Sequence, residues 1–211
     1  MKFTGRAGLI ATLLMATAAV QAQSEWSANV GWASDYFYRG IHQKQSSVSG
    51  GIDYGNSGFY AGVWAADVGE LTGNGLEIDG YFGYGGTVGD FSYGAGFTGY
   101  YYTGDFDDTY QEINLSAGYA FITLDVAIGE YDNFGGPTQD YQFYSLTAEH
   151  QGFYGKYGTF DDQFEGAYFE AGYATTLSSI DVAFYGLYAD ENLIGEEEHA
   201  LVLTVGKSFS F

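Results

Sequence analysis

Apolar and polar residues alternate with a period of two along most of the chain. Ile122, Leu124 and Val126 share one face of a segment whose other face carries Thr123 and Asp125. A period of two places successive side chains on opposite sides of a β-strand. Twelve such segments are separated by short turn clusters or by longer polar loops. We predict strands at residues 25–35, 46–54, 58–68, 76–88, 90–102, 109–120, 122–131, 140–150, 153–160, 165–175, 178–188 and 198–210.

The connections between these segments alternate in length along most of the chain. Tight connections are predicted at residues 55–57, 89, 121, 151–152 and 176–177. Bacterial outer-membrane barrels have short periplasmic turns and longer extracellular loops. The pattern therefore predicts an even number of strands with both termini in the periplasm. The acidic loops would then face outward, at residues 105–108, 161–165 and 190–198.

Composition favours strands that span a membrane. The 211 residues include 33 Gly, 21 Tyr, 17 Phe and 3 Trp but one Pro, a mixture that suits strands and interfacial aromatic belts. After the N-terminal segment no run of eighteen apolar residues occurs, so no spanning helix is predicted. Strands satisfy their backbone groups in lipid by closing into a barrel. We predict an all-β fold, a transmembrane antiparallel up-and-down β-barrel of about twelve strands.

A soluble β-sandwich is the alternative fold, because its strands also alternate and turn their polar face to bulk water. Aromatic residues crowd the ends of the predicted strands, at residues 59–60, 100–102 and 153–154. Rings at both ends of a span are typical of the girdles at the membrane interface. This pattern favours the membrane barrel.

Both termini indicate export to the outer membrane of a Gram-negative bacterium. Lys2 and Arg6 precede an apolar stretch and a small-x-small pattern, which predicts a signal peptide at residues 1–22 and a barrel domain at residues 23–211. The last strand resembles the closing strands read by the bacterial barrel-assembly machinery, with Phe209 and Phe211 as the assembly signal. Outer-membrane lipids and lipopolysaccharide would surround such a protein.

The charge is strongly acidic. Six basic residues stand against 27 acidic residues, a formal net charge of −21 at pH 7. Nucleic-acid binding needs a basic surface and is therefore not predicted. The chain has no Cys, which fits an exported protein without disulfides and suggests no redox chemistry.

Acidic residues repeatedly fall on the polar face of a predicted strand. A charge on the lipid face costs up to roughly 2–4 kcal/mol, so these faces are expected to line the lumen. The predicted pore-lining residues are Asp53, Glu77, Asp79, Glu112, Asp125, Glu170, Asp181 and the basic residue Arg39. Arg39 either pairs with a lumenal acid near a constriction or is held at a loop base by stacking on nearby rings. An acidic lumen predicts a preference for cations.

Catalytic, metal and cofactor sites are not predicted. His42 falls in the predicted first long loop, His150 at a turn and His199 at a strand start, and no glycine-flanked serine accompanies them. The glycines lie within strand patterns rather than in a phosphate-binding loop, so no cofactor is expected. Acidic clusters at residues 105–108 and 196–198 lack the spacing of a calcium loop. Whether these loops bind divalent cations stays open.

Residues 29–68 resemble a known family. The resemblance is carried by the segments Ser34-Asp35-Tyr36 with Arg39-Gly40, and Gly58-Phe59-Tyr60 with Gly62 and Trp64. They are similar to the TorF porin family, also described as the Gcw_chp family of proteobacterial outer-membrane proteins. His42 departs from the family, which usually has Ser there. The resemblance implies an outer-membrane pore and assigns no functional residues.

The sequence therefore predicts a porin-like, non-enzymatic channel for passive diffusion of small hydrophilic solutes or cations. One alternative is a structural or adhesive barrel whose lumen is plugged, for example by Tyr81, Tyr100 and Tyr185. The other is an outer-membrane lipid enzyme, which would need a serine within hydrogen-bond reach of His150 or His199. The oligomeric state stays open.

Overall fold

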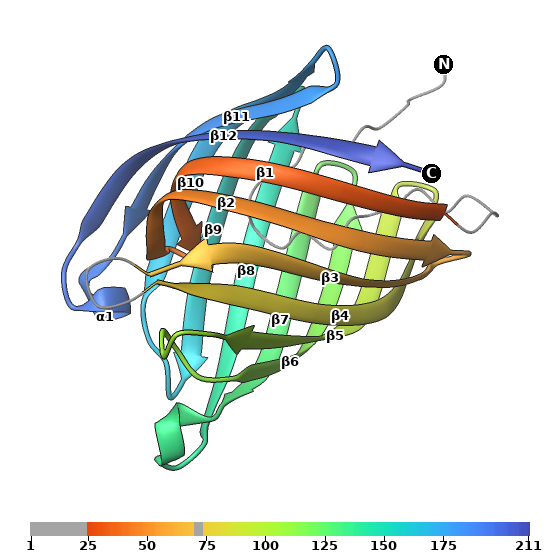
Figure 1. The fold of residues 1–211 in the computed structure, drawn as a ribbon. Coiled ribbons are helices and arrows are strands. Elements are labelled where there is room, and N and C mark those ends of the chain that lie inside the picture. The colour runs from red at the N-terminus through yellow and green to blue at the C-terminus, as the bar shows by residue number, and fades with distance from the viewer. Residues whose placement is uncertain (1–24, 70–73) are drawn as a thin grey trace.

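The computed structural model describes residues 25–69 and 74–211 and forms one closed barrel (Figure 1). Twelve antiparallel strands follow one another around the barrel in chain order, and the last pairs with the first. The strands are β1 (Glu25–Tyr38), β2 (Ile41–Asn56), β3 (Phe59–Val68), β4 (Gly75–Val88), β5 (Phe91–Tyr102), β6 (Tyr110–Tyr119), β7 (Ile122–Tyr131), β8 (Gln139–His150), β9 (Phe153–Asp162), β10 (Ala167–Leu177), β11 (Ile180–Ala189) and β12 (Glu198–Ser210).

These strands confirm the predicted fold class. Each predicted segment corresponds to one observed strand, because period-two alternation survives wherever one face meets lipid and the other the interior. A 3₁₀ turn, η1 (Asn133–Gly135), and the short helix α1 (Glu191–Ile194) lie in connections. Within the described residues no helix is long and apolar enough to cross a membrane. The predicted signal peptide lies outside the described residues.

Both ends of the described chain meet at one end of the barrel, together with five tight turns. The Phe211 amide donates to the Trp26 carbonyl at 2.9 Å, and the Trp26 amide donates back at 3.3 Å. The tight turns join β2 to β3, β4 to β5, β6 to β7, β8 to β9 and β10 to β11. The opposite end carries most of the longer connections, including the one that contains α1, on the left of Figure 1.

The prediction of a long loop between the first two strands is wrong. β1 continues to Tyr38 and β2 begins at Ile41, so a two-residue turn of Arg39 and Gly40 joins them. Both turn residues have positive φ, 50° and 84°, as tight hairpin turns of the common primed type require. His42 accordingly lies in β2, opposite Phe37. A register shift between Tyr36 and Phe37 interrupts the pairing, and this irregularity masked the strand in the sequence.

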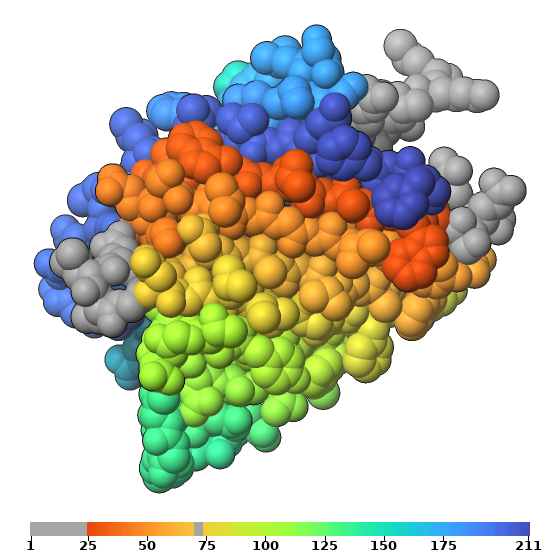
Figure 2. All heavy atoms as spheres, in the orientation of Figure 1, coloured from red at the N-terminus to blue at the C-terminus, as the bar shows by residue number. Residues whose placement is uncertain are grey.

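The outer wall is apolar all around the barrel. Side chains that are more than a third exposed occur on every strand, among them Val30, Ile52, Val63, Phe82, Tyr93, Ile113, Leu124, Leu146, Tyr157, Phe169, Phe184 and Leu201. Figure 2 shows this surface as a continuous wall over β1 to β5. Buried charges face the other way, since Glu77, Asp79 and Glu112 are each 1% exposed. An apolar exterior around a charged interior is the organisation of a transmembrane barrel and excludes the soluble sandwich.

Candidate functional site

The tip of the first hairpin folds into the barrel, while its second arm stays linked to the end of β3, where the Gly69 amide donates to the Gln43 carbonyl at 3.1 Å. β1 pairs with β12 from Ser27 to Ala33, and β2 pairs with β3 from Ser49 onward. Residues 34–48, here called the inward hairpin, lie beyond these pairings. Tyr36, Phe37 and Arg39 of this segment are all less than a tenth exposed. The tip of a hairpin, normally among the most exposed parts of a barrel, is thus buried.

The tip is fixed to the far wall by an ion pair. Arg39 donates through Nη1 to Glu112 Oε1 at 2.5 Å and through Nη2 to Oε2 at 2.9 Å. Glu112 belongs to β6, on the opposite side of the ring of strands from β1. Two parallel bonds from a guanidinium fix geometry as well as charge. The guanidinium carbon also lies 4.2 Å from the ring centre of Phe143. Arg39 therefore both pairs with an internal acid and stacks on a ring.

Glu112 is a fully partnered carboxylate. Besides Arg39, Tyr100 donates to Oε2 at 3.0 Å and Tyr141 donates to Oε1 at 2.7 Å. Four hydrogen bonds satisfy a buried carboxylate whose charge is offset by the arginine. Glu112 thereby anchors the inward hairpin.

Three further contacts seat the inward hairpin across the lumen. The Tyr36 hydroxyl donates to Glu77 Oε2 at 3.0 Å, and the Tyr38 hydroxyl donates to the Tyr100 hydroxyl at 2.8 Å. Gly40 lies so close to β10 and α1 that an added Cβ would stand 2.7 Å from Tyr168 Cβ. Glycine is required there by this close approach as well as by its positive φ. The hairpin thus contacts strands on several sides of the barrel and narrows the interior.

An apolar cluster fills the interior beside the hairpin. Phe37 inserts among side chains from the β7 to β12 side of the barrel, and each member is under a tenth exposed. The cluster contains Phe37, Ala127, Phe143, Tyr154, Tyr168, Tyr185, Leu187, Ala189 and Val202. At this level the interior is packed on one side. The side toward β3 to β6 carries Glu77, Asp79 and Glu112.

Glu77 and Asp79 lie on β4, on the inner wall beside the inward hairpin. Asp79 faces Trp64 on β3 and Tyr100 on β5 in the strand register. Both Asp79 carboxylate oxygens are buried and accept no hydrogen bond, and the same holds for Glu77 Oε1. Buried polar atoms in proteins are nearly always partnered. Asp79 is exceptional among the described acids because both of its carboxylate oxygens lack a partner, whereas Glu77 and Glu170 each leave one oxygen without a partner.

The other predicted acids also lie on the inner wall but have neighbours that offset them. Asp53 accepts from the Tyr81 hydroxyl and from Asn29 Nδ2, and Asp181 accepts from Thr176 at 2.6 Å. Glu170 lies opposite Lys156 in the strand register and both are buried, although Glu170 Oε2 accepts no hydrogen bond. Asp125 is half-buried on the inner face of β7.

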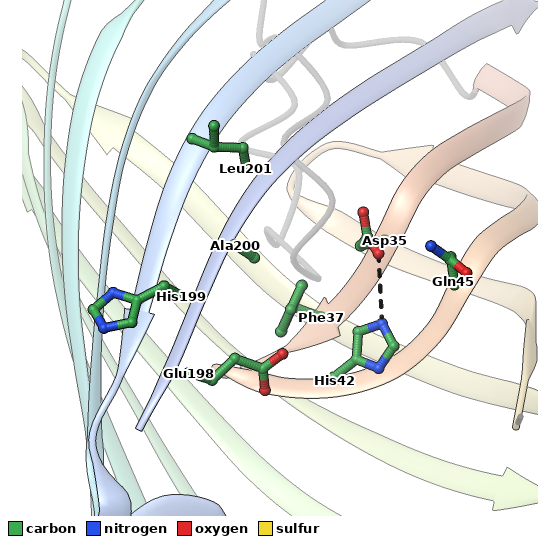
Figure 3. Close-up of a pocket in the computed structure, with 8 residues that line it drawn as sticks. All are labelled: Asp35, Phe37, His42, Gln45, Glu198, His199, Ala200 and Leu201. Carbon is green, nitrogen blue, oxygen red and sulfur yellow. Dashed lines mark ion pairs between the residues drawn. The ribbon is translucent and has the colours of Figure 1, made fainter. Parts of the chain in front are cut away.

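A pocket opens where the inward hairpin parts from β12 (Figure 3). It has a volume of about 350 Å³ and is lined by Asp35, Phe37, His42, Gln45, Glu198, His199, Ala200 and Leu201. His42 Nε2 lies 3.8 Å from Asp35 Oδ1, the pair joined by the dashed line in Figure 3. At the base of the gap the Leu203 amide donates to Ser34 Oγ at 3.0 Å, a side-chain bond in place of regular strand pairing.

The histidines do not assemble a nucleophile site in the described part of the chain. His150 ends β8 and is exposed, and His199 is exposed with its ring 5.1 Å from that of Tyr188. Among the described residues, no serine hydroxyl bonds to His150 or His199. The arrangement required by a lipid enzyme is therefore not found there.

Sequence reasoning offered a lumenal acid as one possible partner of Arg39 but did not identify Glu112, and it missed that Lys156 lies opposite Glu170. The link between Arg39 and Glu112 joins residues 73 positions apart, across the interior. One signal was present: Arg-Gly directly after three aromatic residues is compatible with a tight turn that carries aromatic side chains.

The family model described as "Bacterial protein of unknown function (Gcw_chp)" matches residues 17–157, and the chain belongs to this family. Comparison with curated proteins gives no match. Among solved structures, the COG4313 outer membrane channel from Pseudomonas putida F1 superposes with a TM-score of 0.57 at 8% identity, over 94% of this chain and 100% of that one.

A second solved structure has the same kind of fold. This structure, from work on the in-meso crystallization of membrane proteins, has a TM-score of 0.53 at 8% identity over 89% of this chain and 84% of that one. Pseudomonas aeruginosa OccK1 (OpdK) gives 0.42 at 13% identity over 80% of this chain, which spans 57% of OccK1. At 8% identity the likeness to the first two structures concerns the fold alone, and the OccK1 score is too low to carry an argument.

Proposed function

We propose that this protein is an outer-membrane channel that passes small hydrophilic solutes or ions by passive diffusion and prefers cations. An apolar outer wall around a charged inner wall supports a place in lipid. The fold shared with an outer membrane channel and the resemblance to the TorF porins agree with this proposal. In this arrangement both termini are periplasmic, the barrel-assembly machinery inserts the chain, and lipopolysaccharide surrounds the end with longer loops.

The inward hairpin makes the channel narrow. Its tip is held against β4, β5 and β6, and Phe37 is packed in the apolar cluster on the other side. Solutes passing this level have to fit between the hairpin and the inner wall. The proposed cargo is therefore restricted to ions and small hydrophilic molecules.

The observation that carries cation preference is an imbalance of charge on the inner wall. The chain beyond residue 24 has four basic residues, Arg39, Lys44, Lys156 and Lys207. Arg39 is bound to Glu112 and Lys156 lies beside Glu170, whereas Glu77 and Asp79 face no base. A wall with uncompensated carboxylates concentrates cations and repels anions.

Reversal potentials in planar bilayers under a KCl gradient test this function. Cation preference is expected, and it should fall in the Asp79→Asn variant. Lys207→Gln is the matched control, because Lys207 lies on the outer wall register opposite Val30 and its charge does not face the lumen. Anion preference of the unmodified protein would contradict the proposal.

A plugged structural or adhesive barrel is the second candidate function, favoured by one observation. The apolar cluster around Phe37 fills much of the interior at the level of the inward hairpin. Liposome swelling with small sugars separates the two candidates: a channel swells the vesicles, whereas a plugged barrel leaves their volume unchanged in the same assay.

A further inference from the structure

Asp79 is the least compensated charge in the described interior. The residue is 1% exposed, and neither of its carboxylate oxygens accepts a hydrogen bond. Glu77 lies two positions earlier on the same face of β4. Its Oε2 accepts a hydrogen bond from the Tyr36 hydroxyl, and its Oε1 has no partner. Three buried carboxylate oxygens therefore lie together on the wall without donors. Burying ionised carboxylates in this way costs several kcal/mol unless a positive charge accompanies them.

The protein's own basic side chains do not supply that charge. Arg39 places two of its nitrogens on Glu112, and Lys44 is bound to Asp67 at 2.9 Å. Lys156 stands on β9 beside Glu170, and Lys207 lies against Phe209 on the outer wall. These four are all the basic residues beyond position 24. The compensating charge has to come from solution, as a bound cation or as protons.

Aromatic side chains surround the unpaired carboxylates. Trp64 and Tyr100 flank Asp79 on the neighbouring strands, and the inward hairpin contributes Tyr36, whose ring centre is 6.0 Å from that of Trp64. Ring faces attract a cation that has shed part of its water. Tyr38 adds a hydroxyl oxygen close to Tyr100. Carboxylates bordered by rings and phenolic oxygens match the chemistry of a small, partly dehydrated cation.

We propose that Asp79 and Glu77, together with the rings of Trp64, Tyr36 and Tyr100, form a binding site for a small monovalent cation beside the inward hairpin. This proposal rests on the proposed channel function: a permeating cation binds transiently at this site. A divalent ion fits less well, because Ca²⁺ takes six to eight oxygen ligands and Mg²⁺ keeps several waters that the surrounding rings do not bind. Within the described residues, no group of three or more acidic, His or Cys side chains is arranged to hold a metal ion.

Infrared difference spectroscopy of the refolded barrel tests binding without requiring conduction. At pH 7, replacing N-methylglucamine by K⁺ should shift carboxylate stretching bands, and part of this change should be lost in Asp79→Asn and in Glu77→Gln. Asp53→Asn is the matched control, since Asp53 is also lumenal but already accepts from Tyr81 and Asn29. An intact K⁺ response in Asp79→Asn would overturn the site. The site would also be overturned if the unmodified protein in K⁺ shows a protonated carboxyl band that disappears in Asp79→Asn, because Asp79 would then carry a proton instead of K⁺.

Single-channel conductance against KCl concentration separates failure of the site from failure of the channel. A binding site makes conductance saturate, and Asp79→Asn should move saturation to higher KCl. Lys207→Gln, on the outer wall, should leave it in place. Heat-modifiable migration on gels shows that each variant has folded. Conductance that rises linearly with KCl in the unmodified protein would refute the site while leaving the channel intact. A K⁺ infrared response in a barrel without conductance would refute the channel while leaving the site.

Discussion

Arg39 and Glu112 join the tip of the first hairpin to the opposite wall of the barrel, through two hydrogen bonds of 2.5 and 2.9 Å. Both side chains are under a tenth exposed. The pair holds the inward hairpin inside the barrel. The Tyr100 and Tyr141 hydroxyls donate the two remaining hydrogen bonds to Glu112. The width of the interior therefore depends on this long-range contact together with those of Tyr36 and Tyr38.

Removing this contact should widen the channel. In Arg39→Ala the hairpin loses its anchor, and single-channel recordings are expected to show higher and more variable conductance. Arg39→Lys should give an intermediate result, because an ammonium does not reproduce the paired bonds of the guanidinium. Lys44→Ala serves as control, since it removes a base from the same hairpin without touching Glu112. Unchanged conductance in Arg39→Ala would show that the hairpin does not limit flow.

The same pair should contribute non-additively to stability. Arg39→Met or Glu112→Met alone leaves an unpaired buried charge and should lower the free energy of unfolding by about 3–5 kcal/mol. The double variant should lose less than the sum of the two, because no isolated charge remains. Urea unfolding in lipid vesicles, followed by Trp fluorescence, gives the coupling energy. The more exposed pair of Lys44 and Asp67, with side chains 19% and 27% exposed, should couple more weakly, by about 1 kcal/mol. Equal coupling in both pairs would contradict the assigned anchor.

Gly129 gives a test of how closely the inner wall is packed. A Cβ at this position would lie 2.5 Å from Tyr141 Cζ and 2.9 Å from Glu112 Cγ. Gly129→Ala should therefore displace Tyr141 from Glu112 and cost about 1–3 kcal/mol of stability. Gly80→Ala is the control, because a Cβ there meets no atom within 4 Å. Equal unfolding midpoints for the two variants would count against this packing.

The closing strand allows insertion to be tested separately from stability. Phe211 is 72% exposed beside the start of β1, so replacing it removes little packing. If Phe211 is read by the assembly machinery, Phe211→Ala should reduce the folded protein in cells while refolding in detergent is unchanged. Phe121→Ala, at an exposed aromatic of a tight turn, controls for loss of an interfacial ring. A matching loss in both variants would argue against a specific assembly signal.

The twelve strands and their two faces could be predicted because lipid imposes a local rule. Apolar and polar side chains must alternate along each strand between lipid and interior. The outward positions of Ile122 and Leu124 and the inward position of Asp125 can therefore be predicted from neighbouring residues in the sequence. The same rule failed at residues 36–45. There the successive residues Tyr36 and Phe37 are both buried and the register shifts between them, so alternation no longer reports the surroundings.

The sequence by itself determined the barrel, its apolar exterior and the excess of acid on its inner wall. The tertiary structure decided which of those acids are compensated. Glu112 and Asp79 look alike in the sequence, as acids on inward faces of neighbouring regions. Barrel closure and the inward hairpin bring Arg39 to Glu112 and leave Asp79 without a base. Strand periodicity fixes the side of the wall on which a residue lies, whereas its partner across the interior depends on how the whole ring of strands closes.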